Sequence, residues 1–272
     1  MTNFSVLISV YRNDNAQFFL DALRSIYNFQ TLKPSQIVLV KDGPLPNSLN
    51  QIIDLFKLEC PVLDILSLEH NVGLGLALNE GLKECSFELV ARMDSDDISK
   101  PNRFKEQLEF ICNNPDIDII SCWIDEFQED IGNVVSIRKL PPNHEDCVKM
   151  LKYGCPLSHP AVVFKKSLVL DVGSYQSLYL KEDLYLWLRL FEKNAKFSNI
   201  QNSLLFFRIS DNVYARRRGW EYMKSEFILF HFRLKIKLIN IYEFTLYTFV
   251  ICIVRLLPKQ ILRFVYKILR KQ

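Results

Sequence analysis

Glycine is scarce in this chain, at 8 of its 272 residues. Nucleotide-binding enzymes with a phosphate loop near the N-terminus need closely spaced glycines there, and residues 8–15 contain none. Gly73 and Gly75 are followed by Leu-Ala-Leu, so the third glycine of a dinucleotide-binding motif is missing. The chain also has no Walker, His-Glu-x-x-His or Gly-x-Ser-x-Gly sequence. These absences argue against dinucleotide enzymes, P-loop enzymes, zincins and α/β-hydrolases.

Close cysteine pairs are also absent. The seven cysteines are scattered through the sequence, at Cys60, Cys85, Cys112, Cys122, Cys147, Cys155 and Cys252. An odd, dispersed set is typical of reduced thiols in a cytosolic compartment. The first residues lack the basic segment of a secretion signal. The sequence therefore predicts that the catalytic part faces the cytoplasm.

Charge is divided unevenly along the chain. Residues 205–272 hold 14 Lys and Arg against 4 Asp and Glu, although the net charge of the whole chain is only +3. A basic, aromatic-rich end attached to an acidic body predicts contact with an anionic surface, either lipid head groups or nucleic acid.

The last residues show a helical charge pattern. Basic residues recur every four positions, at Arg255, Lys259, Arg263, Lys267 and Lys271. Large aliphatic residues fill the positions between them, which indicates a basic amphipathic helix interrupted at Pro258. The uncharged run 244–254 is shorter than the roughly 20 residues that span a bilayer. A helix lying in the membrane interface is favoured over a span or packing on the protein, and nucleic acid is not expected as a partner.

The first hundred residues alternate between apolar runs and amphipathic stretches. Strand patterns cover 4–11, 36–40, 62–66 and 87–93, and helical patterns cover 16–29, 47–58 and 74–84. The alternation predicts an α/β fold with a Rossmann-like, mostly parallel sheet flanked by helices. Further along, the patterns indicate helices at 101–113 and 144–152, a strand at 117–123 and a hairpin near 125–139. Ligands of such sheets bind at the carboxyl ends of the strands.

Acidic residues follow two of these strands. Asp42 ends one, and Asp94, Asp96 and Asp97 come directly after another. Three carboxylates in four residues repel one another unless a cation lies among them. Mn²⁺ or Mg²⁺ would take these oxygens together with substrate phosphates. The alternative is a solvated acidic turn that caps the next helix.

Six short motifs in a fixed order resemble the second family of glycosyltransferases, whose nucleotide-binding architecture is the GT-A fold. They are Ser9-Val10-Tyr11, Val40-Lys41-Asp42-Gly43, the run 71–79, the run 91–97, Ser158-His159-Pro160 and the run 182–188. Each motif is weak alone, but the ordered set is specific. The resemblance implies a GT-A catalytic domain over 1–210, with a nucleotide-binding half at 1–100 and an acceptor-binding half at 101–210, and a helical membrane-associating tail over 211–272.

The resemblance also implies the residues of the donor site. Val10 and Tyr11 would flank the nucleotide base, and Asp42 would accept a hydrogen bond from uracil. Asn71 and Asn79 would hold or shape the nucleotide side.

Arg92 would also hold or shape the nucleotide side. The Asp-x-Asp motif completes the implied donor site. Asp94 would lie near the ribose and Asp96 on the metal. A metal there neutralises the charge that grows on the leaving nucleoside diphosphate.

The pair Glu182-Asp183 precedes an apolar helical run. Two acids at a helix start are favoured by the helix dipole, and that capping role is the plainer interpretation. The resemblance makes Asp183 the candidate general base, with Glu182 beside it, and predicts inversion at the anomeric carbon. Relatives in the family often have a further acid where Tyr185 stands, so the role of that acid is absent or changed here.

Weaker candidates lie further along the chain. His159 would lie near the acceptor or the diphosphate. Arg208 and the run Arg216, Arg217 and Arg218 could contact a diphosphate of the donor or of a lipid-linked acceptor, although a run of arginines is usually a solvated surface.

The resemblance implies an inverting enzyme, and a non-processive one, because the Gln-x-x-Arg-Trp motif of the processive synthases in the family is missing. The expected reaction moves galactose or glucose from a UDP-sugar to an N-acetylhexosamine on a polyprenyl diphosphate, in a β1,3 linkage, for O-antigen or other surface polysaccharide. The expected location is peripheral, at the cytoplasmic face of a bacterial inner membrane. The alternatives are a sugar nucleotidyltransferase and a non-enzymatic membrane-surface protein.

Overall fold

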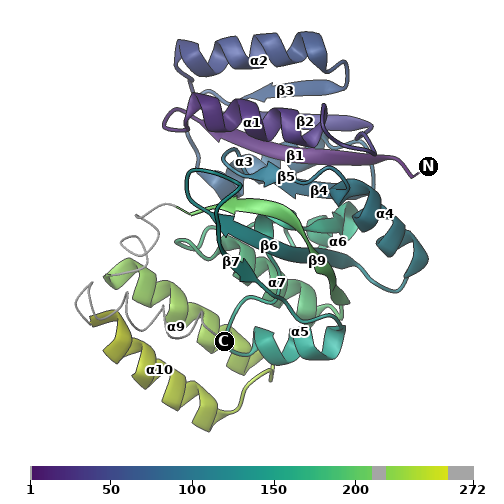
Figure 1. The fold of residues 1–272 in the computed structure, drawn as a ribbon. Coiled ribbons are helices and arrows are strands. Elements are labelled where there is room, and N and C mark those ends of the chain that lie inside the picture. The colour runs from purple at the N-terminus through teal and green to yellow at the C-terminus, as the bar shows by residue number, and fades with distance from the viewer. Residues whose placement is uncertain (1, 210–218, 257–272) are drawn as a thin grey trace.

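A computed structural model describes residues 2–209 and 219–256. One sheet runs through the molecule in the order β3-β2-β1-β4-β8-β6-β9-β5, with β7 paired to β6 (Figure 1). The strands are β1 (Phe4–Tyr11), β2 (Gln36–Asp42), β3 (Leu63–Ser67), β4 (Leu89–Met93), β5 (Ile98–Ser99), β6 (Ile119–Phe127), β7 (Val134–Arg138), β8 (Val163–Lys165) and β9 (Phe197–Arg208). The helices are α1 (Ala16–Ile26), α2 (Asn47–Glu59), α3 (Leu74–Glu84), α4 (Arg103–Asn113), α5 (His144–Leu151), α6 (Lys166–Asp171), α7 (Glu182–Glu192), α9 (Trp220–Lys235) and α10 (Ile241–Leu256).

Helices cover both faces of the sheet. Alternate residues of β1 point to opposite faces, so Val6 and Ile8 pack with α1, α2 and α4 while Leu7 packs with α3 and α7. Burial on both faces explains why β1 and β2 appear as nearly continuous apolar runs.

The predicted α/β fold is confirmed. β3, β2, β1 and β4 pair in parallel, as the alternation of strands and helices requires. Beyond β4 the sheet is mixed, because β8 runs antiparallel to both of its neighbours. The predicted hairpin is β6–β7, and β6 extends to Phe127 because it pairs with β9 over its whole length. Ser158 is extended, and the chain then forms a single 3₁₀ turn, His159–Ala161, that leads into β8.

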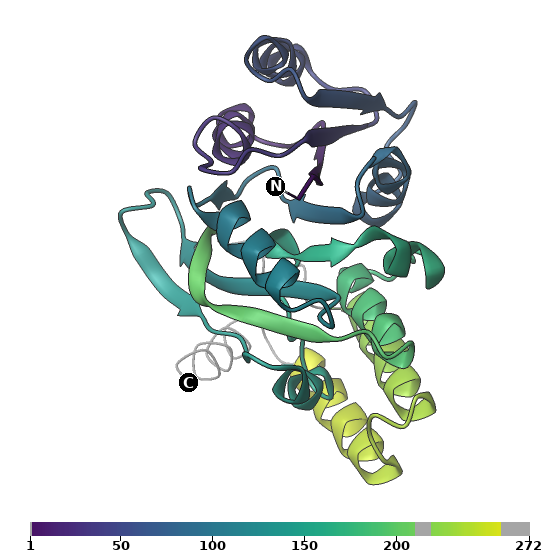
Figure 2. The same cartoon turned by 90° about the vertical axis from the view of Figure 1, so that its right-hand side faces the viewer.

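The chain after β9 forms a helical hairpin. α9 and α10 lie side by side at the end of the molecule opposite α2 (Figures 1 and 2). Tyr222, Leu229 and Phe230 of α9 are buried, so this helix is packed on the body. Residues 257–272, which contain most of the predicted basic helix, lie outside the described part of the chain. Within the described part, no helix is long and apolar enough to cross a membrane.

Candidate active site

Three parallel strands end at one edge of the sheet. The register pairs Tyr11 of β1 with Asp42 of β2, and on the other side it pairs Ile8 with Met93, the last residue of β4. The acidic loop 94–97 follows at once. The sheet therefore brings Asp42 and the acidic loop to the same edge, where the sequence places the donor.

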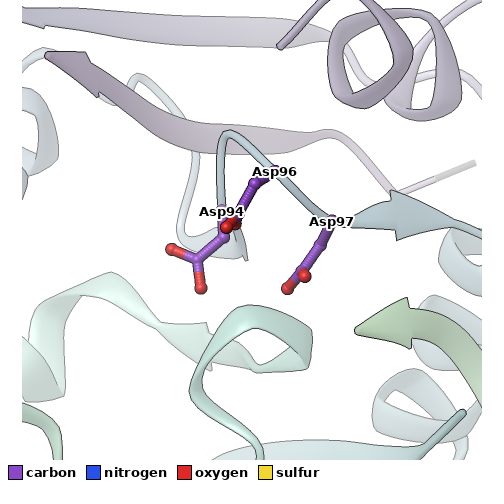
Figure 3. A group of neighbouring side chains, drawn as sticks. All are labelled: Asp94, Asp96 and Asp97. Carbon is purple, nitrogen blue, oxygen red and sulfur yellow. The ribbon is translucent and has the colours of Figure 1, made fainter. Parts of the chain in front are cut away.

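The acidic loop forms a compact cluster. The carboxylate oxygens that Asp94, Asp96 and Asp97 offer lie within 4.8 Å of one another (Figure 3). Asp97 is fully buried, and its Oδ2 has no hydrogen-bond partner among the described residues. Burial, and then the carboxylates of Asp94 and Asp96, raise the pKa of Asp97 well above its usual range. A divalent cation would relieve this repulsion with the oxygen ligands that Mg²⁺ and Mn²⁺ prefer, so the residues fit such an ion.

Two buried arginines lie beneath the cluster. Arg92 forms an ion pair with Asp94, and its Nε and Nη1 have no hydrogen-bond partner among the described residues. Burial alone would lower the pKa of Arg92, but the Asp94 carboxylate raises it above its usual value. Arg103 donates from Nη2 to the carbonyl of Arg92 at 2.7 Å. Sequence analysis identified Arg92 but missed Arg103, which belongs to no motif that it considered.

Arg208 is attached to the acidic loop by its main chain and its side chain. Its backbone N–H donates to Oδ1 of Asp97 at 2.9 Å, and its Nε donates to the carbonyl of Asp96 at 3.0 Å. The guanidinium lies 3.7 Å from the ring centre of Phe18 and 4.5 Å from that of Phe127. These contacts position the loop. The predicted partners of Arg208, Arg216 to Arg218, lie outside the described residues.

Asp42 anchors the turn that precedes α3. Its carboxylate accepts hydrogen bonds from Asn71 Nδ2 at 2.8 Å and from the backbone N–H groups of Val72 at 2.7 Å and Gly73 at 3.1 Å. A carboxylate has about four acceptor positions, so one remains for a ligand. The predicted contact to uracil stays a prediction.

The two residues at the end of β1 differ in exposure. Val10 is 1% exposed and belongs to the core, so only its backbone can face a nucleotide. Tyr11 is 40% exposed, which leaves its ring available for a base.

Asn79 and His159 both hold Tyr175. The Asn79 amide donates to the Tyr175 carbonyl and accepts from its N–H, each at 2.7 Å. Nε2 of His159 lies 2.9 Å from the Tyr175 hydroxyl, and the His159 ring contacts Trp187 of α7. Asn79 therefore fixes the backbone of Tyr175, and its predicted role at the nucleotide side stays a prediction. Sequence analysis missed Tyr175 because no local pattern marks a hydrogen bond between distant segments.

The predicted acidic pair begins α7, as expected. A Cβ on Gly75 would lie 3.3 Å from Cγ of Glu182, so α3 and α7 meet at their first turns. Burial raises the pKa of Tyr175, and the nearby carboxylates of Asp183 and Asp94 raise it further. Tyr175 and the first turn of α7 therefore both lie against Gly75 of α3.

Tyr185 packs on α9. Its ring meets Phe232 edge to face at 5.2 Å. The position at which relatives often have an acid therefore serves the contact with the helical hairpin.

Comparison with known proteins agrees with this geometry. A model described as Glycosyl transferase family 2 matches residues 5–169, and the chain belongs to that family. It is 37% identical to the UDP-Gal:alpha-D-GlcNAc-diphosphoundecaprenol beta-1,3-galactosyltransferase of Escherichia coli, over 97% of this chain and 95% of the relative. It is 35% identical to the amylovoran biosynthesis glycosyltransferase AmsE of Erwinia amylovora, over 98% and 99% of the two chains.

A solved structure has a similar fold. S. aureus TarS 1-349, crystallised with UDP-GlcNAc, aligns with a TM-score of 0.69 at 18% identity, over 89% of this chain and 69% of the other. Family membership makes this chain a glycosyltransferase with a GT-A fold. The nucleotidyltransferase and non-enzymatic alternatives are set aside.

Proposed function

We propose that this chain transfers a single hexose, galactose in preference to glucose, from a UDP-sugar to an N-acetylhexosamine carried on polyprenyl diphosphate, in a β1,3 linkage. The observation that supports it most is the identity of 37% to the E. coli galactosyltransferase, which extends over 97% of this chain. The product would enter O-antigen or another surface polysaccharide.

The donor would bind along the sheet edge. The exposed ring of Tyr11 and the remaining acceptor position of Asp42 would meet the base, and the buried charge of Arg92 would favour the diphosphate. Asp96, with Asp94, would hold Mn²⁺ or Mg²⁺, which when bound neutralises the leaving UDP. Asp97 and Arg208 would keep the acidic loop in place.

The acceptor would approach from the side of α7. Asp183 would take the proton from the acceptor hydroxyl as that oxygen attacks the anomeric carbon opposite UDP. Attack from the opposite face converts an α-linked donor into a β-linked product. Glu182, pressed against Gly75, would orient this first turn and the sugar beside it. We place residues 1–100 on the donor side and 101–210 on the acceptor side.

We place the reaction at the cytoplasmic face of a bacterial inner membrane, with the protein bound peripherally through residues 211–272. One observation and one expectation support this location. Cys60, Cys85, Cys112, Cys122, Cys147 and Cys155 are free thiols, as in a reducing compartment. The expected acceptor is itself lipid-bound.

The test is transfer from a panel of radiolabelled UDP-sugars to a synthetic N-acetylglucosamine diphosphate lipid, with manganese or with chelator. Asp96→Ala and Asp183→Asn should each lower kcat at least about a hundredfold. Asp54→Asn, at an exposed acid of α2, is the matched control and should keep full activity. Calorimetry should find that Asp183→Asn still binds UDP. Transfer that survives chelation, or survives Asp183→Asn, would reject the mechanism.

A further inference from the structure

The outer face of the α9–α10 hairpin is unusually apolar. In α10, Tyr242 is 84% exposed, Phe249 65% and Leu246 59%. With Val250 they recur at helical spacing, so they share one side of the helix. Phe227 of α9 is half exposed and reaches α10 through a ring contact with Phe244 at 5.9 Å. Contiguous exposed apolar residues of this kind mark an interaction surface.

The charges around this surface are mostly positive. Lys224, Lys235 and Lys237 of the hairpin are exposed, against one exposed acid, Glu221. Glu243 accepts a hydrogen bond from the Tyr153 hydroxyl at 2.8 Å. The sequence that follows α10, residues 257–272, has five Lys and Arg and no acid. Lysines beside exposed aromatic and aliphatic side chains match an anionic bilayer, in which rings enter the interface and amines meet the phosphates.

A second copy of this chain fits the surface poorly. A two-fold dimer would place the surface against itself, so the lysines of one copy would face those of the other. Over the described residues α10 has 16 residues, fewer than the roughly 20 that a membrane span needs.

The hairpin is rigidly connected to the candidate catalytic helix. Lys181, the residue before Glu182, forms a buried ion pair with Glu226 of α9 at 2.9 Å. Tyr185 of α7 packs on Phe232 of the same helix. Because α9 contacts both α7 and α10, a surface bound by α10 would be separated from α7 by one helix, α9 (Figure 2).

We propose that the exposed face of the α9–α10 hairpin, formed by Phe227, Tyr242, Leu246, Phe249 and Val250, docks on an anionic lipid bilayer with α10 lying in the plane of the interface. The docking directs the α7 side of the site toward a lipid-linked acceptor. This inference rests on the proposed function, whose peripheral membrane binding it assigns to named residues.

The test is co-sedimentation of the full chain with vesicles of phosphatidylglycerol and phosphatidylethanolamine, or of phosphatidylcholine alone. The double variant Leu246→Glu/Phe249→Glu should lower binding to the anionic vesicles at least about tenfold. Leu58→Glu, at an 85% exposed leucine of α2 at the other end of the molecule, is the control and should bind as the wild type does.

Transfer to a water-soluble, short-chain acceptor separates docking from catalysis, because the double variant should keep wild-type kcat in that assay. Unchanged binding of the double variant would overturn the proposal. Equal binding of the wild type to both kinds of vesicle would do the same. The proposal would also be overturned if light scattering found the wild type to be a dimer and the double variant a monomer. The surface would then be occupied by a second copy of the chain.

Discussion

The hydroxyl of Ser95 donates a hydrogen bond of 2.8 Å to Oδ2 of Asp14. The same oxygen accepts the backbone N–H of Tyr11 at 3.0 Å. One carboxylate therefore joins the end of β1, where the base is expected, to the middle of the acidic loop. Burial raises the pKa of Asp14, and the N–H and hydroxyl donors oppose that shift.

Ser95→Ala should weaken donor binding without unfolding the protein. A hydrogen bond to a charged group contributes about 1.5–3 kcal/mol, so the loss of this link should raise the Kd for UDP in the presence of manganese by at least roughly tenfold. Calorimetric titration measures the change. Ser167→Ala is the control. It removes a serine hydrogen bond to Glu88, which directly precedes β4, at the end of the strand opposite to the acidic loop. Equal affinities for wild type and Ser95→Ala would show that the link does not organise the site.

Two glycines of α3 should respond differently to alanine. A Cβ on Gly81 would lie 2.5 Å from both Leu7 Cδ1 and Val40 Cγ2, which overpacks the core. Gly81→Ala should lower the free energy of unfolding by about 1–3 kcal/mol. A Cβ on Gly75 meets Glu182 Cγ at 3.3 Å and Tyr175 Cβ at 3.5 Å, which is tight but not impossible.

Gly75→Ala should therefore change stability little and lower kcat by displacing Glu182. Urea unfolding and initial rates on the two variants check both statements. The reverse pattern, with Gly75→Ala unstable and fully active, would contradict this account of the contact between α3 and α7.

The parts of the fold that sequence predicts are those with a strong local pattern. β1, β2 and β4 are buried on both faces, so each is recognisable in the sequence as an apolar run. Once β2 and β4 were recognised, Asp42 and Asp94 could be placed at their ends. Glu182 begins α7 because acids favour a helix start. β8 has only three residues, and β5 two, so neither leaves a periodic pattern.

Contacts between distant segments were not predictable for a different reason. Asn15 caps α1 by accepting from the N–H groups of Gln17 and Phe18. Asp14 instead reaches Ser95, 81 residues away in sequence. The link between Tyr175 and Asn79 is of the same kind. Side chains that meet only after the sheet has formed have no local sequence pattern.

Arg208→Lys should not be a conservative change. Lysine keeps the charge but cannot both stack between Phe18 and Phe127 and donate from a fixed Nε to the Asp96 carbonyl. The loop should loosen, and the affinity for manganese, followed by water proton relaxation, should fall several-fold. Arg24→Lys, in an exposed pair with Glu59, is the control.

A different result would restore the role expected from sequence. If Arg208→Lys keeps the wild-type affinity for manganese but raises KM for the UDP-sugar, Arg208 contacts the diphosphate directly.

His159 should make stability depend on pH. Burial, and then the charge of Arg92, lower the pKa of His159 well below its ordinary value of 6.5. The folded chain therefore keeps this imidazole neutral, while the unfolded chain takes up a proton as the pH falls below 6.5. Proton uptake favours the unfolded state, so this group lowers stability at acid pH by about 1.4 kcal/mol at one unit below the ordinary pKa.

His159→Gln keeps an acceptor for the Tyr175 hydroxyl but cannot titrate. The difference in the free energy of unfolding between this variant and the wild type should thus shift by about 1.4 kcal/mol in favour of the variant between pH 7.5 and pH 5.5. Urea unfolding at the two pH values measures it, with His70→Gln at an exposed histidine as the control. If the wild type and His159→Gln lose stability in parallel, the pKa of His159 is not lowered in the folded chain, and the imidazole that contacts the Tyr175 hydroxyl takes up its proton there as readily as in the unfolded chain.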